Sequence, residues 1–256
     1  MLRGLYTSVS SMLTLQSRQG IITNNLANIN TTGYKQETLL GKSFDEVMLS
    51  NNDNYKNGKA NKQILGNMSF GVRIDDTFTN YSQGTNVSTE NNMDFAIEGN
   101  GFFEVMDNQN NRYYTRNGDF SVDAQGYLIT SSGHYVLGVN NTTGATERIN
   151  VGNNTMSVTS DNAININGQE RYRFRVVDFQ NYDNLENTGN GVYTGTNPNN
   201  ATNFNVKQGY LESSNVDSIN SAALLMETVK EFEANQKVVQ AMDSILYKIA
   251  NEIGRV

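Results

Sequence analysis

Few residues in this chain have the types and spacing that catalysis or metal binding requires. The sequence contains one histidine, His134, and no cysteine, so it cannot build the common zinc sites of histidine and cysteine. His134 follows Gly133 in a turn-rich stretch, which predicts a position in a turn or at the surface. A serine-histidine-aspartate triad would depend on His134, and no Gly-x-Ser-x-Gly nucleophile elbow exists. We therefore expect no catalytic residue and no metal site.

Two short stretches match ligand-binding loops only in part. Residues 99–103, Gly-Asn-Gly-Phe-Phe, begin like a phosphate-binding loop but lack the later glycine, the lysine and the helix pattern. We interpret them as a tight turn that leads into a strand. Residues 107–111, Asp-Asn-Gln-Asn-Asn, resemble the start of a calcium loop, yet the glycine at position six and the glutamate at position twelve are missing. The sequence predicts a turn there, and we expect no cofactor.

Acidic residues are plentiful, so a carboxylate pair for glycoside hydrolysis is an open alternative. Asp75-Asp76, Asp119 and Asp123 are examples, and nothing in the sequence marks them as buried. Solvated surface acids are the default interpretation. An enzyme that acts on cell-wall glycan would turn over peptidoglycan and would lose that turnover when a single Asp or Glu is replaced.

Charge and hydropathy limit the partners of the chain. The 256 residues carry a formal charge of −7 and no long basic run, which argues against a general nucleic-acid binder. No stretch approaches the roughly 20 apolar residues that span a bilayer, so we expect no membrane insertion. Residues 1–10 lack the continuous apolar core of a secretory signal. We expect either a cytoplasmic protein or one exported by a route that needs no cleaved leader.

The two ends of the chain predict the elements that would position any functional surface. Near the N-terminus, apolar residues recur mostly at helical steps of three, four and seven, and Gly33 is a plausible helix stop. Near the C-terminus, Ser213-Ser214-Asn215 offers capping oxygens, and a near-heptad apolar seam runs from Leu225 to Ile253. We predict that these two helices pair, because each has an apolar stripe to bury.

The middle of the chain predicts β-structure. Asp94–Glu98 and Arg171–Val176 alternate with a period of two, and Gly-containing turn signals separate such runs. The polar segment 51–61 shows no periodicity and is interpreted as a loop or extended arm. The predicted fold class is α+β, with N- and C-terminal helices that pair as a coiled coil and a central all-β domain. The predicted division is 1–39 plus 211–256 for the helical domain, 40–69 for the arm and 70–210 for the β-domain.

The polar residues within the N-terminal stripe allow two interpretations. Asn24, Asn25 and Asn28 could face solvent, or they could lie at an interface and fix its register, as buried asparagines do in coiled coils. On the second interpretation, Asn25→Leu loosens assembly specificity and leaves the β-domain folded. The residues that we predict at the assembly interface are Leu5, Val9, Met12, Asn24, Asn25, Leu26, Asn28, Ile29, Leu225, Val229, Phe232, Val239, Met242, Leu246 and Ile249.

Three segments resemble a known family. Residues 24–35, NNLANINTTGYK, look like the signature of bacterial flagellar basal-body rod and hook proteins. Residues 94–105, which include AIEGNGFF, and residues 114–120, YTRNGDF, form a second match. Residues 208–217, QGYLESSNVD, followed by EANQK at 233–237, form a third. The matches run in family order over nearly the whole chain, and together they are specific.

The resemblance implies a structural axial subunit of the flagellar rod, which self-assembles helically and transmits torque from motor to hook. In that family both termini form a coiled-coil inner layer around the export channel, and the β-domain forms an outer layer. The implied partners are copies of the chain, neighbouring rod and hook proteins and the flagellar type III export apparatus. The implied location is the basal body, outside the cytoplasmic membrane, reached without a cleaved signal peptide.

The resemblance leaves the branch of the family open. Hook proteins usually carry a further outer domain and small proximal-rod subunits lack most of the β-domain, so the length favours the distal-rod type. The related proximal-rod type and a short hook-type subunit are alternatives. The arm from about Leu40 to Met68 lies where distal-rod proteins carry an extra segment. A different class, a secreted glycan-binding module, would bind its ligand with both termini deleted, whereas the same deletion would abolish assembly of a rod protein.

Overall fold

The computed structural model describes residues 2–51, 55–56, 59–60, 63–152, 154–159 and 161–253. Within this part of the chain, an N-terminal helix, a C-terminal helix and a large central set of strands confirm the predicted α+β class. The chain divides into two compact units. We call residues 1–26, 37–78 and 218–256 the helical unit, and residues 27–36 and 79–217 the β-unit.

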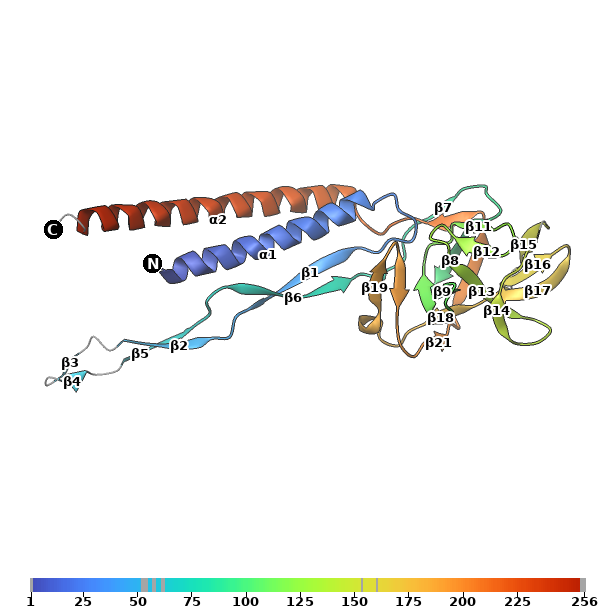
Figure 1. Ribbon diagram of the computed structural model, residues 1–256, viewed down its shortest axis with the longest axis horizontal. Coiled ribbons are helices and arrows are strands. Elements are labelled where there is room, and N and C mark those ends of the chain that lie inside the picture. Colours follow the sequence, from blue (N-terminus) through green and yellow to red (C-terminus); the bar gives the residue numbers. More distant parts are fainter. Residues whose placement is uncertain are drawn as a thin grey trace. The chain divides into compact units, whose positions relative to one another are not determined.

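Two long helices lie side by side in the helical unit and run in opposite directions (Figure 1). They are α1 (Leu2–Ala27) and α2 (Ser218–Ile253). Gly4 lies close to the Met242 side chain, because a Cβ placed at Gly4 would be 2.6 Å from the terminal methyl of Met242. The two helices therefore contact one another at Gly4 and Met242. Neither helix, over its described residues, is long and apolar enough to cross a membrane.

Both helix ends differ from the predicted ones. The N-terminal helix ends at Ala27, because Asn28 accepts hydrogen bonds from the Thr31 amide and hydroxyl and closes a turn. The predicted capping role of residues 213–215 is wrong, because the C-terminal helix begins at Ser218. The Asn215 side chain instead bonds to backbone groups of the β-unit, accepting from the Gln36 amide at 2.8 Å.

The segment predicted as an arm forms part of a two-stranded hairpin in the helical unit. β1 pairs with β6 and β2 pairs antiparallel with β5, while the short strands β3 and β4 pair with each other. Residues 52–54, 57–58 and 61–62, which belong to the polar stretch predicted as a loop or arm, lie outside the described residues. The bounds are β1 (Glu37–Ser43), β2 (Val47–Asn51), β3 (Tyr55–Lys56), β4 (Lys59–Ala60), β5 (Gln63–Met68) and β6 (Val72–Thr79).

Glycine allows the hairpin to approach α1. Gly71 has a φ of +123°, and a Cβ at this position would overlap the Ser10 side chain and lie 3.6 Å from the Thr7 Cα. Gly71 also accepts a hydrogen bond from the Phe44 amide at 3.0 Å, which joins the connection between β1 and β2 to the connection between β5 and β6. A larger residue at position 71 would push the hairpin away from the helix.

The β-unit is built on one sheet of 13 strands among its described residues, with the main order β15-β16-β17-β13-β9-β10-β20-β19. Two small pairs, β22-β8 and β23-β7, accompany it, together with a 3₁₀ turn at Tyr182–Asn184. The strands are β7 (Asn86–Ser88), β8 (Phe95–Gly99), β9 (Phe102–Met106), β10 (Arg112–Thr115), β11 (Phe120–Val122), β12 (Leu128–Thr130), β13 (Tyr135–Asn140), β14 (Thr146–Arg148), β15 (Met156–Val158), β16 (Ala163–Ile166), β17 (Gln169–Phe174), β18 (Val176–Asp178), β19 (Glu186–Gly189), β20 (Val192–Thr194), β21 (Asn199–Asn200), β22 (Phe204–Gln208) and β23 (Tyr210–Glu212).

The central strands carry apolar side chains on both faces of the sheet. Phe103 pairs with Val176, and both belong to the larger core cluster. The adjacent pair, Phe102 with Val177, belongs to the second cluster on the opposite face. Successive residues of a strand point to opposite faces, so a sheet buried on both sides requires such continuous apolar runs.

Candidate functional site

The residues that the sequence singled out for chemistry lie in turns. His134 follows a turn at residues 131–133, where its ring Nδ1 lies 3.1 Å from the Ser132 hydroxyl and its ring packs edge-on against Tyr113. Gly99 and Gly101, both with positive φ, form the tight turn between β8 and β9, as predicted. The Asp107 carboxylate accepts hydrogen bonds from the backbone of its own turn. Among the described residues, no group of three or more His, Cys, Asp or Glu side chains could hold a metal ion.

One pair of acids lies close together. Asp94 and Asp119 form an isolated antiparallel bridge, and the Asn91 amide donates to the Asp94 carboxylate at 2.9 Å. Burial raises the pKa of Asp119, and the charge of Asp94 raises it further. Asp119 is nevertheless exposed to solvent. Asp94 immediately precedes β8 and Asp119 immediately precedes β11, and we assign no chemistry to the pair.

The most unusual polar arrangement in the β-unit is a buried ion cluster of Lys35, Arg116 and Glu212. The Lys35 ammonium donates to Glu212 Oε1 at 2.5 Å, and Arg116 Nη1 donates to Glu212 Oε2 at 3.1 Å. The side chains of Lys35 and Glu212 are 0% exposed, and that of Arg116 is 4% exposed. Charged side chains of these types are almost never fully buried unless they are paired. The fold of the β-unit therefore depends on the pairing of these three side chains with one another.

Backbone groups add three hydrogen bonds to the cluster, while the buried Arg116 Nε has no hydrogen-bond partner among the described residues. The Gly84 amide donates to Glu212 Oε1 at 2.9 Å, Lys35 donates to the Ser82 carbonyl at 2.8 Å, and Arg116 donates to the Gly99 carbonyl at 2.8 Å. Burial lowers the pKa of Lys35, Glu212 opposes that shift through its charge and hydrogen bond, and the charge of Arg116 adds to it. The negative charge of Glu212 therefore offsets the free-energy cost of burying the two cations.

Gly33 lies against the backbone beside the same cluster. Its φ is +68°, and its amide donates to the Glu212 carbonyl at 2.8 Å. A Cβ at this position would lie 2.5 Å from the Asn117 nitrogen and 2.6 Å from the Arg116 carbonyl carbon. The Thr32 hydroxyl donates to the Asn117 side chain at 2.8 Å. The three segments that resemble the rod and hook family therefore meet in space, although up to 177 positions separate them along the chain.

Asn25 has a defined role in the helical unit. Its side chain is buried, and the exposed fraction of the residue is 2%. The amide donates to the Glu37 carbonyl at 2.7 Å and accepts from the Glu37 nitrogen at 3.0 Å, so it pairs with β1 as a neighbouring strand would. Asn24 is exposed, and Asn28 lies in the turn after α1. A contact between these three asparagines and a neighbouring subunit stays a prediction.

Replacing Asn25 with leucine should destabilise the helical unit and leave the β-unit folded. The change removes both bonds to Glu37, at about 1–3 kcal/mol for each backbone group left without a partner. Hydrogen exchange should show reduced amide protection in β1 and in the last turns of α1. Asn24→Leu, at the exposed neighbouring position, is the matched control. Equal protection in the two variants would contradict this assignment.

The predicted interface residues fall into two groups. On α2, all seven of them are half-buried along one face. On α1, Leu5, Met12 and Leu26 are half-buried, whereas Val9 is exposed. Ile29 lies past the end of α1 in the β-unit, so it does not continue the helical stripe.

The predicted interface residues include only Val9 from a second set of apolar side chains, which are exposed. On α1, Tyr6, Val9 and Leu13 follow helical spacing on a face separate from that of Leu5 and Met12. The spacing of three and four residues was a signal for this second stripe. The hairpin residues carried no comparable signal, because their faces alternate irregularly. The exposed hairpin residues are Leu40, Phe44, Val47, Met48, Ile64, Leu65, Met68, Ile74 and Phe78.

Family models match three parts of the chain. The model described as flagella basal body rod protein matches residues 5–35. The model for the D1 domain of the flagellar hook protein FlgE/F/G matches residues 96–169, and that for the C-terminal part of flagellar basal body rod FlgEFG proteins matches 207–252. Each matched segment contains one member of the buried cluster: Lys35, Arg116 and Glu212, respectively.

Curated relatives match the chain over almost its full length. The chain is 30% identical to the flagellar basal-body rod protein FlgG of Bacillus subtilis (strain 168), over 98% of this chain and 99% of the relative. It is 29% identical to the flagellar hook-basal body complex protein FlhO of the same organism, over the whole of both chains. FlgG of Borreliella burgdorferi is 27% identical, again over the whole of both chains.

Proposed function

The chain belongs to the bacterial flagellar hook and basal-body rod protein family, and from this premise we propose that it is an axial subunit of the flagellar rod. In this role it self-assembles helically, transmits torque from motor to hook and is needed for motility. It has no catalytic task, because its mechanism is packing between subunits. Its partners are copies of itself, neighbouring rod and hook proteins and the flagellar type III export apparatus, which delivers it to the basal body outside the cytoplasmic membrane.

The distribution of exposed apolar side chains carries this proposal. Of the nineteen large hydrophobic side chains that are exposed in the described part of the chain, all but Val87 and Tyr210 lie in the helical unit. The β-unit buries its own apolar residues in two core clusters. Apolar surface gathered in one unit is typical of a protein–protein interface. An isolated two-stranded hairpin is marginal in water, so the hairpin in particular gains from neighbouring subunits.

The distal-rod type is the branch that we propose. Relatives named FlgG match nearly the full chain, and the hairpin occupies the place of the extra segment expected for that type. The similar identity to FlhO keeps two alternatives open, the related FlgF type of the proximal rod and a short hook-type subunit.

Deletion of the gene and imaging of the basal body by electron cryotomography test the function and the branch together. For a distal-rod subunit we expect non-motile cells whose rods stop short and carry no hook, with motility restored by the intact gene. A rod that stops earlier would assign the chain to the proximal rod, and a complete rod without a hook would indicate a hook-type subunit. Complete hook–basal bodies in the deletion strain would contradict the proposed function.

A further inference from the structure

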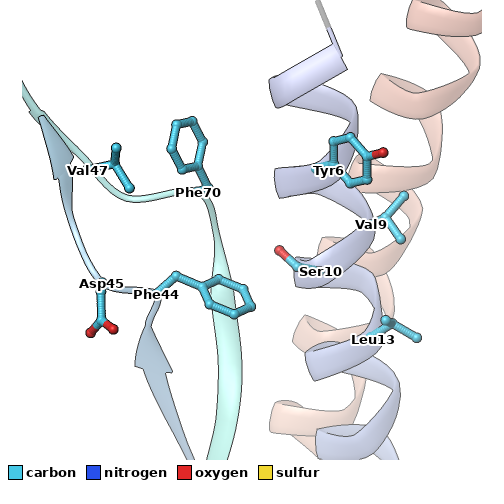
Figure 2. A pocket seen from close by; sticks show the side chains of 8 residues that line it. All are labelled: Tyr6, Val9, Ser10, Leu13, Phe44, Asp45, Val47 and Phe70. Carbon is cyan, nitrogen blue, oxygen red and sulfur yellow. The ribbon is translucent and has the colours of Figure 1, made fainter. Parts of the chain in front are cut away.

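The helical unit contains an open apolar groove between α1 and the hairpin. It has a volume of about 590 Å³, and Figure 2 shows Ser10 of α1 and Phe44 of the hairpin pointing toward one another across it. The Arg3 guanidinium lies 5.3 Å from the centre of the Phe70 ring. Apart from Ser10 and Asp45, the lining side chains are apolar. They are Tyr6, Val9, Leu13, Phe44, Val47 and Phe70.

The chain itself does not fill this groove. Tyr6 is 68% exposed, Leu13 is 59% exposed and Val47 is 50% exposed. These side chains lie on two different elements and still face water, whereas the stripe on the other face of α1 is half-buried. Apolar walls of this kind lower the free energy when a complementary apolar surface replaces the water between them.

A complementary surface exists on α2 of the same chain. Ala234, Val238, Ala241 and Ile245 follow one another at steps of four, three and four residues, and all four are exposed. This spacing places them in one line on a helix. We call the line the outer stripe; it is separate from the seam of Val239, Met242 and Leu246, whose side chains are half-buried.

The groove and the outer stripe match in spacing. Tyr6 and Leu13 of the groove are seven residues apart on α1, and so are Val238 and Ile245 of the stripe on α2. Seven residues correspond to about 10 Å along a helix. Ala241 lies between the two large residues of the stripe, and a side chain of this size allows close approach of the helix backbone.

Part of the groove rim and one side of the outer stripe also carry opposite charges. Asp45 lines the groove, and the next residue, Glu46, is exposed beside it. Exposed lysines border the outer stripe at positions 230, 237 and 248. Complementary charges at the rim of an interface fix its register and favour the correct partner.

We propose that the groove between α1 and the hairpin receives the outer stripe of α2 from a second copy of this chain. This inference rests on the proposed function, because it requires self-assembly, and it names the surfaces that meet. The two surfaces are different patches on one molecule, so the contact is heterologous. A repeated heterologous contact that does not close produces an open helical assembly, as a rod requires.

The absence of native cysteine makes cysteine cross-linking a clean test. The full chain would carry Leu13→Cys in the groove together with Val238→Cys in the outer stripe. Both residues are exposed, so neither change opens a core cavity. Polymers of the purified variant and hook–basal bodies isolated from cells would be treated with a short bismaleimide and separated by denaturing electrophoresis. The matched control pairs Leu13→Cys with Gln240→Cys, an exposed position on another face of α2.

We expect a ladder of covalent dimers, trimers and larger species from the first pair, and at least a tenfold lower yield from the control pair. Assemblies of normal appearance that give no ladder would overturn the inference and leave the proposed function standing. Dimers from either single-cysteine variant alone would overturn it too, because they indicate a symmetric contact. If the protein is absent from isolated hook–basal bodies and forms no polymer, the proposed function fails, and the inference fails with it.

Discussion

Replacing Glu212 with glutamine should lower the free energy of unfolding of the β-unit by about 3–5 kcal/mol. Lys35 and Arg116 both donate to this carboxylate, and all three side chains are almost fully buried. Glutamine has nearly the same shape but carries no charge, so two buried cations would lose their only counter-charge within the cluster. The loss is large because a protein domain is typically stable by only about 5–15 kcal/mol.

An exposed ion pair provides the matched control. Lys207 and Glu98 lie 2.9 Å apart, with side chains that are 39% and 51% exposed. Glu98→Gln should therefore cost about 0–1 kcal/mol, because water screens the pair. Urea unfolding combined with hydrogen exchange of β8 and β9 would report on the β-unit alone. Equal losses in Glu98→Gln and Glu212→Gln would show that burial does not set the strength of the cluster.

Replacing Lys35 with methionine separates charge balance from packing. The variant retains one cation and one anion, Arg116 and Glu212, together with the bond from the Gly84 amide to Glu212. We expect a smaller loss than in Glu212→Gln, because no unpaired charge remains buried. A larger loss in Lys35→Met would indicate that the ammonium acts mainly through its bond to the Ser82 carbonyl.

The sequence predicted the regular elements well, because their signals are local. The seam from Leu225 onward lies within α2, and the period-two runs correspond to β8 and to β17 with β18. The break between β17 and β18 at Arg175 carries no signal in the alternation of residues. The start of α2 was less predictable, because Asn215 bonds to the Gln36 amide, 179 positions away along the chain.

The contact between the three family motifs could not be derived from the spacing of residues along the chain. Lys35 and Glu212 are 177 positions apart, and neither residue type predicts burial. The resemblance identified the right segments and suggested that they serve assembly. The structure shows that parts of all three, at Gly33, Arg116 and Glu212, pack together within the β-unit, and their role in assembly stays a prediction. The hairpin was not predicted for a related reason, because β2 and β5 pair across 12 to 21 residues and the hairpin exposes much of its apolar surface.

Replacing Gly33 with alanine should destabilise the β-unit by about 2–5 kcal/mol, because two costs add. The φ of +68° disfavours any residue with a Cβ, at about 1–2 kcal/mol. The added methyl group would also lie 2.5 Å from the Asn117 nitrogen and 2.6 Å from the Arg116 carbonyl carbon. These are backbone atoms, which cannot rotate away as a side chain does, and overpacking of this kind costs about 1–3 kcal/mol or more.

Gly133 separates the two costs. It also has a positive φ, +82°, but nothing lies within 4 Å of the position that its Cβ would occupy. Gly133→Ala should therefore show the conformational cost alone, about 1–2 kcal/mol. Thermal unfolding of both variants, followed by hydrogen exchange in β10, would measure the difference that the contact with residues 116–117 makes. We expect Gly33→Ala alone to abolish motility when it replaces the native gene. Equal unfolding temperatures for the two variants would mean that the backbone beside Arg116 yields to the methyl group, and that Gly33 is required only for its φ.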